Sequence, residues 1–246
     1  MNIGRVPLLK EPKLFNYMKI LSIATFLIVI FFTHKSFSQQ TIFNVPSADI
    51  LQKDKVFVQH ESQFRAKDPQ NFINATNYFA YGAGNNIEID ATLFNLSSPT
   101  SKNVALGIGF KSAYEIEALK DYQAKIIFGD MVPFSLQGNG VGNWLYVEPS
   151  FYVSQTSTRI TGGISYGTKQ IFGEEVVCFL GGFEQKVTAK INFIGDWYSG
   201  NHALGIFANG FSYQFPRDLT FYAGYQIPNS KEVGRNSFVI EVAKIF

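Results

Sequence analysis

Apolar and polar residues alternate at every second position along most of the chain after residue 54. In residues 86–96, for example, isoleucine, alanine and leucine alternate with glutamate, aspartate and threonine. A period of two places the two kinds of side chain on opposite faces of a β-strand. No apolar period of 3.6 residues persists for more than two turns, so we expect little helix.

Clusters of Gly, Asn, Ser, Pro and Asp divide this part of the chain into segments of about ten residues, the spacing typical of transmembrane β-barrels. We expect twelve strands, at 55–65, 74–83, 86–96, 103–114, 122–133, 143–154, 158–167, 175–186, 189–198, 203–213, 218–227 and 236–246. Pro149 cannot donate a ladder hydrogen bond, and we expect a bulge or bend in the sixth strand. The eighth strand is apolar on both faces around Cys178, as in the core of a β-sandwich.

Two architectures fit such strands: a soluble β-sandwich and a barrel in a membrane. The polar faces are rich in Gly, Ala, Ser and Asn with isolated charges, whereas the solvated face of a sandwich normally carries many charged residues. Aromatic residues gather near strand ends, as in the girdles at membrane interfaces. We therefore predict an all-β fold, a transmembrane antiparallel up-and-down barrel of about twelve strands. A barrel of this size is expected to hold a narrow or partly plugged pore.

The chain begins with the three parts of a secretory signal peptide. Lysines at 10, 13 and 19 precede an apolar run at 20–32, and a polar segment follows. The run is shorter than the roughly 20 residues that a membrane-spanning helix needs. We expect a signal peptide at 1–38, a lead-in segment at 39–53 that lies in the periplasm or plugs the lumen, and a barrel at 54–246.

Composition and charge narrow the class of protein further. Only 16% of the 246 residues are charged and 16% are aromatic, while soluble domains carry about 25% charged residues. The net charge of +2 belongs to the leader: residues 1–38 hold five of the 21 basic and one of the 19 acidic residues, which leaves −2 on the mature chain. This charge does not indicate a nucleic-acid partner. The single cysteine, Cys178, excludes a disulfide scaffold.

The C-terminal segment carries apolar residues at alternate positions behind a terminal aromatic residue. These residues are Phe238, Ile240, Val242 and Phe246. The pattern resembles the C-terminal strand signal of bacterial outer-membrane β-barrels, although Lys244 stands where an apolar residue is usual. The lead-in Thr41–Asp49 looks like the mature start of a poorly characterised group of porin-like barrels. The resemblance implies the outer membrane of a Gram-negative bacterium, with lipid, lipopolysaccharide and the barrel-assembly machinery as partners.

Charged residues on the polar faces are the candidate pore lining, because a basic residue facing lipid at the midplane would cost about 2–4 kcal/mol. They are Glu61, Glu88, Asp90, Lys111, Lys125, Glu148, Arg159, Asp196 and Glu241. Opposite charges across a lumen either brace it or set the field along a permeation path. Because carboxylates outnumber bases, such a path would favour cations.

The leading hypothesis is a narrow passive pore, or porin-like channel, for small solutes. We expect no cofactor and no metal site, since one cysteine and two histidines of the mature chain cannot build a zinc site without distant carboxylates. We do not expect an enzyme, but one alternative is a barrel that modifies lipid or lipopolysaccharide. His60 and Ser62 would carry that catalysis, with an orienting group from a neighbouring strand. A further alternative is a non-catalytic structural or adhesion barrel.

Overall fold

A computed structural model describes residues 41–68, 71–99, 104–138 and 140–246 of the chain. The predicted signal peptide lies outside these residues. Twelve strands form, namely β1 (Val56–Phe64), β2 (Asn71–Gly84), β3 (Ile87–Pro99), β4 (Ala105–Glu115), β5 (Lys125–Ser135), β6 (Trp144–Val153), β7 (Thr158–Gly167), β8 (Val177–Lys186), β9 (Ile191–Tyr198), β10 (Ile206–Phe215), β11 (Leu219–Pro228) and β12 (Ser237–Ile245). The 3₁₀ helix η1 (Glu117–Tyr122) and the short helix α2 (Lys169–Phe172) lie in connections. Among the described residues, no helix is long and apolar enough to span a membrane.

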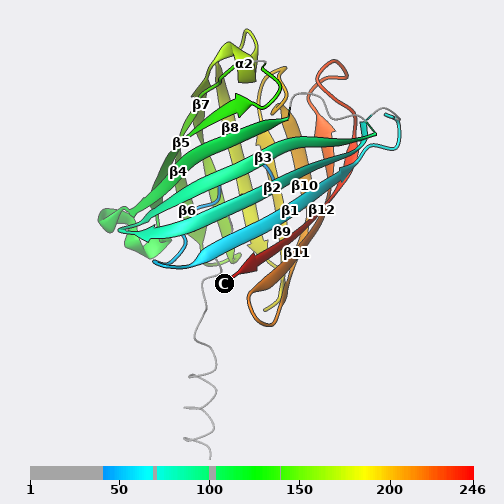
Figure 1. Cartoon of the computed structure of the whole chain (residues 1–246). Helices are drawn as coiled ribbons and strands as arrows, with labels where there is room; N and C mark the ends of the chain where they lie inside the picture. The colour runs from blue at the N-terminus through cyan, green and yellow to red at the C-terminus, as the bar shows by residue number, and fades with distance from the viewer. Residues whose placement is uncertain (1–40, 69–70, 100–103, 139) are drawn as a thin grey trace, which may run out of the picture. The chain divides into compact units, whose positions relative to one another are not determined.

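Each strand pairs antiparallel with its neighbours in sequence, and β1 pairs with β12 to close the barrel (Figure 1). The predicted twelve-strand up-and-down barrel is therefore confirmed. At the closing seam, Phe57 lies opposite Ile245, so the first strand starts and the last strand ends at the same rim. Most turns at this rim are short, while the loops at the other rim are longer. In outer-membrane barrels the periplasmic turns are short and the extracellular loops long, so by this rule the rim where β1 starts and β12 ends is the periplasmic one.

Three details differ from the expected strands. The register of β6 with β7 is the same on both sides of Pro149, so the predicted bulge is absent, and pairing with β7 is interrupted only at Glu148 and Pro149. Bulges lie instead between β2 and β3, at three places. The fifth strand begins at Lys125 rather than 122 because residues 117–122 form η1.

The outer wall of the barrel is apolar. Large exposed hydrophobic residues on it include Val58, Phe79, Ile89, Ile108, Phe110, Leu145, Val147, Ile160, Ile164, Phe179, Phe211, Phe238, Ile240 and Val242. Their neighbours along each strand point inward and are buried polar or small residues, such as Gln59, Thr76, Thr92, Ser150, Thr161, Ser212 and Gln226. Polar side chains inside and apolar ones outside are the arrangement of a barrel in lipid and the inverse of a soluble protein.

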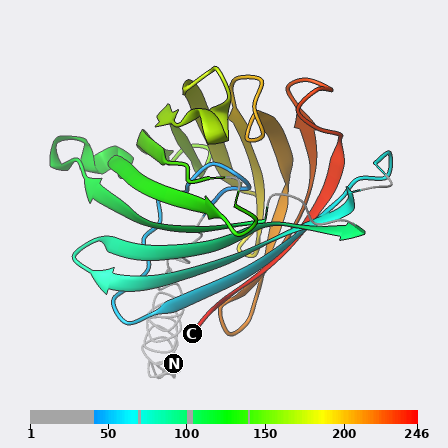
Figure 2. The same ribbon diagram turned by 45° about the horizontal axis from the view of Figure 1, so that its top comes forward.

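Residues 41–53 lie inside the barrel, where they cross the lumen before β1 begins (Figure 2). A tight turn opens this segment: Thr41 bridges Pro46, and the Ile42 N–H donates to the Val45 carbonyl at 2.8 Å. Below, residues 41–53 are called the lumen segment.

Candidate functional site

The lumen collects the charged residues that the alternation assigns to the polar faces. All nine candidates lie on inward-facing positions of their strands: Glu61, Glu88, Asp90, Lys111, Lys125, Glu148, Arg159, Asp196 and Glu241. A tenth charge, Glu184 on β8, was missed. It is the register partner of Arg159 and shares its face with Cys178 and Leu180. Counting every second residue from Cys178 to Glu184 would have placed Glu184 in the lumen. The apolar residues on both faces of the strand make this alternation hard to recognise in the sequence.

One end of the lumen segment wraps around the carboxylate of Asp196 on β9. The backbone N–H groups of Phe43, Asn44 and Val45 donate to its Oδ2 at 2.8, 2.5 and 2.7 Å. The Asn44 side chain also donates to Oδ1 at 3.2 Å. Successive N–H groups that converge on one anion form a backbone nest. Because hydrogen bonds to a charged group contribute about 1.5–3 kcal/mol each, Asp196 is the main anchor of the segment.

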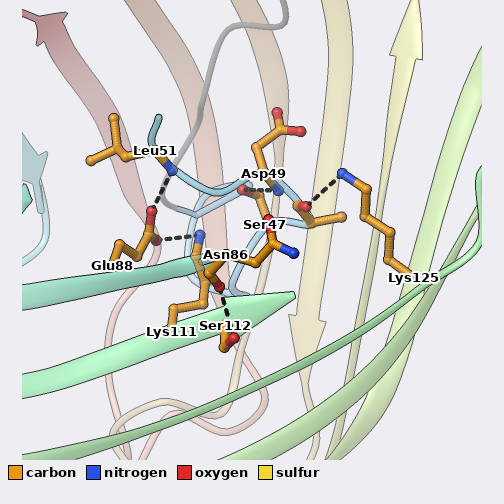
Figure 3. A network of polar contacts seen from close by, with 9 residues as sticks. Ser47, Asp49, Leu51, Asn86, Glu88, Lys111, Ser112 and Lys125 are labelled. Atoms are coloured by element: carbon orange, nitrogen blue, oxygen red, sulfur yellow. Dashed lines mark hydrogen bonds and ion pairs between the residues drawn. The ribbon is translucent and has the colours of Figure 1, made fainter. Parts of the chain in front are cut away.

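The other end of the segment is held at β3, β4 and β5 (Figure 3). The Leu51 N–H donates to Glu88 Oε2 at 2.8 Å, and Glu88 Oε1 pairs with Lys111 Nζ at 3.0 Å. Both partners of this ion pair are almost completely buried. Lys125 donates to the carbonyl of Ala48 at 3.3 Å. Two of the predicted lumen bases thus hold the segment: Lys125 binds it directly, and Lys111 pairs with Glu88, which binds it.

Apolar side chains of the segment pack against glycines of the barrel wall. Ile42 and Phe43 are fully buried. A Cβ added to Gly182 would lie 2.5 Å from Ile42 Cδ1, and one added to Gly224 would lie 2.6 Å from Phe43 Cζ. These approaches require glycine, because any side chain would displace the segment or the neighbouring strand.

With the segment in place the lumen is packed rather than open. Lumen-facing side chains that are at most 1% exposed include Gln59, Glu61, Glu88, Lys111, Glu148, Gln226 and Glu241. Neither carboxylate oxygen of Glu148 has a hydrogen-bond partner. Within the described ranges, no group of three or more His, Cys, Asp or Glu side chains is arranged to hold a metal ion.

His60 and Ser62 lie together on the opposite face of β1, in the outer wall. His60 Nε2 is 2.9 Å from Ser62 Oγ, and His60 Nδ1 is 2.8 Å from Oδ1 of Asn77 on β2. The sequence suggested the histidine and the serine but not the asparagine. Asn77 is brought to His60 by the pairing of β1 with β2, which a single sequence does not reveal.

These features define the class: a closed antiparallel barrel with an apolar outer wall and a polar, charged lumen is an outer-membrane β-barrel. No family model and no curated protein matches the chain. Among solved structures, the NanC porin aligns with a TM-score of 0.55 at 14% identity, over 76% of this chain and 98% of that one. The KdgM porin, solved in complex with disordered oligogalacturonate, aligns with a TM-score of 0.53 at 9% identity, over 78% and 99%. The chain therefore shares its fold with outer-membrane porins.

Proposed function

We propose that the protein is a porin-like channel for small solutes, closed by its lumen segment in the conformation described. The observation that carries this proposal is the way the segment is held. Buried charges of the barrel wall bind it through backbone groups, above all at Asp196. Once the segment leaves, these charges line the lumen and set the field along a permeation path.

The charges of the lumen point to cations as the preferred solutes. Seven carboxylates face three bases along the path, and Lys111 is neutralised by Glu88. Glu148 is fully buried and neither of its carboxylate oxygens has a hydrogen-bond partner, so departure of the segment would leave this side chain without a protein partner in the lumen. The porin-like function involves no catalytic step, and its partners are the lipid and lipopolysaccharide around the outer wall. The exposed C-terminal residues Phe238 and Phe246 offer the barrel-assembly machinery its signal.

Planar-bilayer recording tests the proposal. We expect the mature protein, residues 39–246, to show rare or small openings. Residues 54–246 alone, and the full mature chain with Asp196→Ala, should conduct steadily with a reversal potential that favours K⁺ over Cl⁻. The matched control is Asp121→Asn, which removes the same charge in the exposed η1 and should behave as wild type.

Two results would overturn the proposal. If residues 54–246 shift on gels with heating as a folded barrel does, yet never conduct, the protein is not a channel. If wild type conducts as steadily as Asp196→Ala, the lumen segment does not close it.

A further inference from the structure

The outer wall carries three polar side chains at a place where its surface is otherwise apolar. His60 and Ser62 are outward-facing residues of β1, and Asn77 faces the same way on β2. The register partners of His60 and Ser62 on the other side are Val242 and Ile240 of β12. Below the group lie Val58 and Phe79, which are paired across the two strands, and above it lie Phe64 and Ile73, which are paired likewise. A polar group in such a wall has only its own members as hydrogen-bond partners, since lipid offers none.

The three side chains form one hydrogen-bonded chain. In the tautomer that carries the proton on Nδ1, His60 donates to the Asn77 amide oxygen at 2.8 Å. Nε2 then has its lone pair free and accepts the hydrogen bond of the Ser62 hydroxyl at 2.9 Å. This is the arrangement of an activated nucleophile: a hydroxyl, a base within hydrogen-bond reach and a third group that orients the base.

The group is open to the surroundings of the barrel. His60 is exposed and Ser62 is partly exposed. Ala75, the register partner of Ser62 on β2, is too small to cover it. His202, in contrast, is buried in the loop between β9 and β10, edge to face with Phe172, and its serine contact is with the Ser199 backbone rather than with a hydroxyl.

The depth of Ser62 in the membrane indicates what can reach it. Ser62 lies three residues before Arg65, where the loop at the extracellular rim begins. With a rise of about 3.3 Å per residue and a strand tilt of about 40°, Ser62 lies roughly 8 Å below that loop. A position so near the extracellular rim lies on the side of the barrel where the outer leaflet and its acyl esters are found.

We propose that Ser62, His60 and Asn77 form a hydrolytic site for the fatty-acyl esters of outer-leaflet lipids. Ser62 Oγ attacks the ester carbonyl carbon while its proton passes to His60 Nε2. The C–O bond to the alcohol breaks, and the departing oxygen takes that proton, which leaves an acyl-Ser62 ester. A water molecule, deprotonated by His60, then attacks this ester. The bond from the acyl carbon to Ser62 Oγ breaks, His60 returns the proton to Oγ, and the fatty acid leaves. The sum is ester plus water giving alcohol plus fatty acid. Asn77 is a positioning residue that acts through His60.

The test uses the full mature chain folded in detergent and mixed with vesicles of two kinds. One kind contains phosphatidylethanolamine and phosphatidylglycerol, and the other also contains lipopolysaccharide. Mass spectrometry of released fatty acids shows which lipid supplies the ester. We expect release by wild type and a loss of at least about 10³-fold with Ser62→Ala or His60→Ala. His202→Ala is the matched control and should keep the wild-type rate.

Asn77 and the nucleophile need readouts of their own. Asn77→Ala should lower kcat by at least tenfold with little change in KM, and Asn77→Asp, which also accepts from Nδ1, should restore activity with an altered pH profile. A long-chain fluorophosphonate should label Ser62 in wild type and not in His60→Ala. Absence of both fatty-acid release and Ser62 labelling, in protein that shifts on gels with heating as a folded barrel does, overturns the proposal. Conductance is measured separately. A negative result for ester hydrolysis therefore does not affect the channel proposal, and a negative conductance result does not affect the hydrolytic site.

Discussion

Glu61 on β1 lies directly opposite Glu241 on β12, at the seam that closes the barrel. Both side chains point into the lumen and are 1% exposed. Each is bound by a glutamine of β1: Gln63 Nε2 donates to Glu61 at 2.7 Å, and Gln59 Nε2 donates to Glu241 at 2.7 Å. The two carboxyl groups also hydrogen-bond to each other, so the pair shares a proton.

Replacing one of these two carboxyls by an amide should stabilise the barrel, because the amide donates a hydrogen bond without a charge to desolvate. We expect Glu61→Gln to raise the free energy of unfolding by about 0.2–1 kcal/mol, the range of a cross-strand pair. The midpoint of urea unfolding in lipid vesicles, followed by tryptophan fluorescence, measures this. A clear fall of the midpoint would show that the seam depends on the carboxylate rather than tolerating it.

Replacing Glu88 by glutamine should destabilise the barrel, in contrast to the same replacement at Glu61. Its carboxylate pairs with Lys111 at 3.0 Å and accepts from the Leu51 N–H. Removing one partner of a buried ion pair costs about 3–5 kcal/mol, because the other charge stays buried without compensation. We expect Glu88→Gln to lower the unfolding midpoint strongly and Glu88→Gln combined with Lys111→Met to recover most of it. A double variant as unstable as the sum of the single ones would show that the two residues act independently.

The strands could be predicted from the sequence because one strand's periodicity needs no knowledge of its neighbours. Alternation alone places Glu88 and Asp90 in the lumen, and the structure has both there. Contacts between distant segments could not be predicted this way. The nest around Asp196 joins residues about 150 positions apart, and nothing local marks Phe43 or Val45 as its donors. Asn77 was not predicted, because its contact with His60 depends on the register of β1 with β2. The expectation that Pro149 would cause a bulge was wrong, because the strand lacks one ladder hydrogen bond there without any change of register.

His202, in the loop between β9 and β10, should make that loop sensitive to pH. Burial lowers the pKa of His202 below its ordinary value of 6.5, against smaller opposing effects of the Ser199 backbone and Glu175. Its Nδ1 accepts from the Leu204 N–H, which requires the neutral ring. With the folded pKa depressed, the loop has its full stability above pH 6.5 and loses it as the pH falls from there toward the folded pKa. Hydrogen exchange of residues 199–205, corrected for intrinsic rates, should be faster at pH 5 than at pH 7.5.

The variant His202→Asn checks this assignment. It keeps a polar side chain but does not titrate, so its exchange rates should show no step between these two pH values. A step of the same size in the variant would assign the effect to a group of the loop other than His202, or to Glu175 of the neighbouring connection between β7 and β8.

Phe246 should matter more for assembly in cells than for the stability of the folded barrel. Its backbone N–H donates to the Val56 carbonyl at 2.8 Å, and the Val56 N–H donates back at 3.4 Å, so the last residue closes the seam at the periplasmic rim. Its ring is 64% exposed and supports little of the fold. Phe246→Ala keeps both backbone bonds and loses only the ring. We therefore expect it to refold in detergent as wild type does, but to yield several-fold less heat-modifiable protein in outer membranes of an expressing cell. Phe211→Ala, which removes an equally outward-facing ring from β10, should reach the membrane normally. Equal losses for the two variants would mean that any aromatic residue of the outer wall serves, and that the C-terminal position carries no signal.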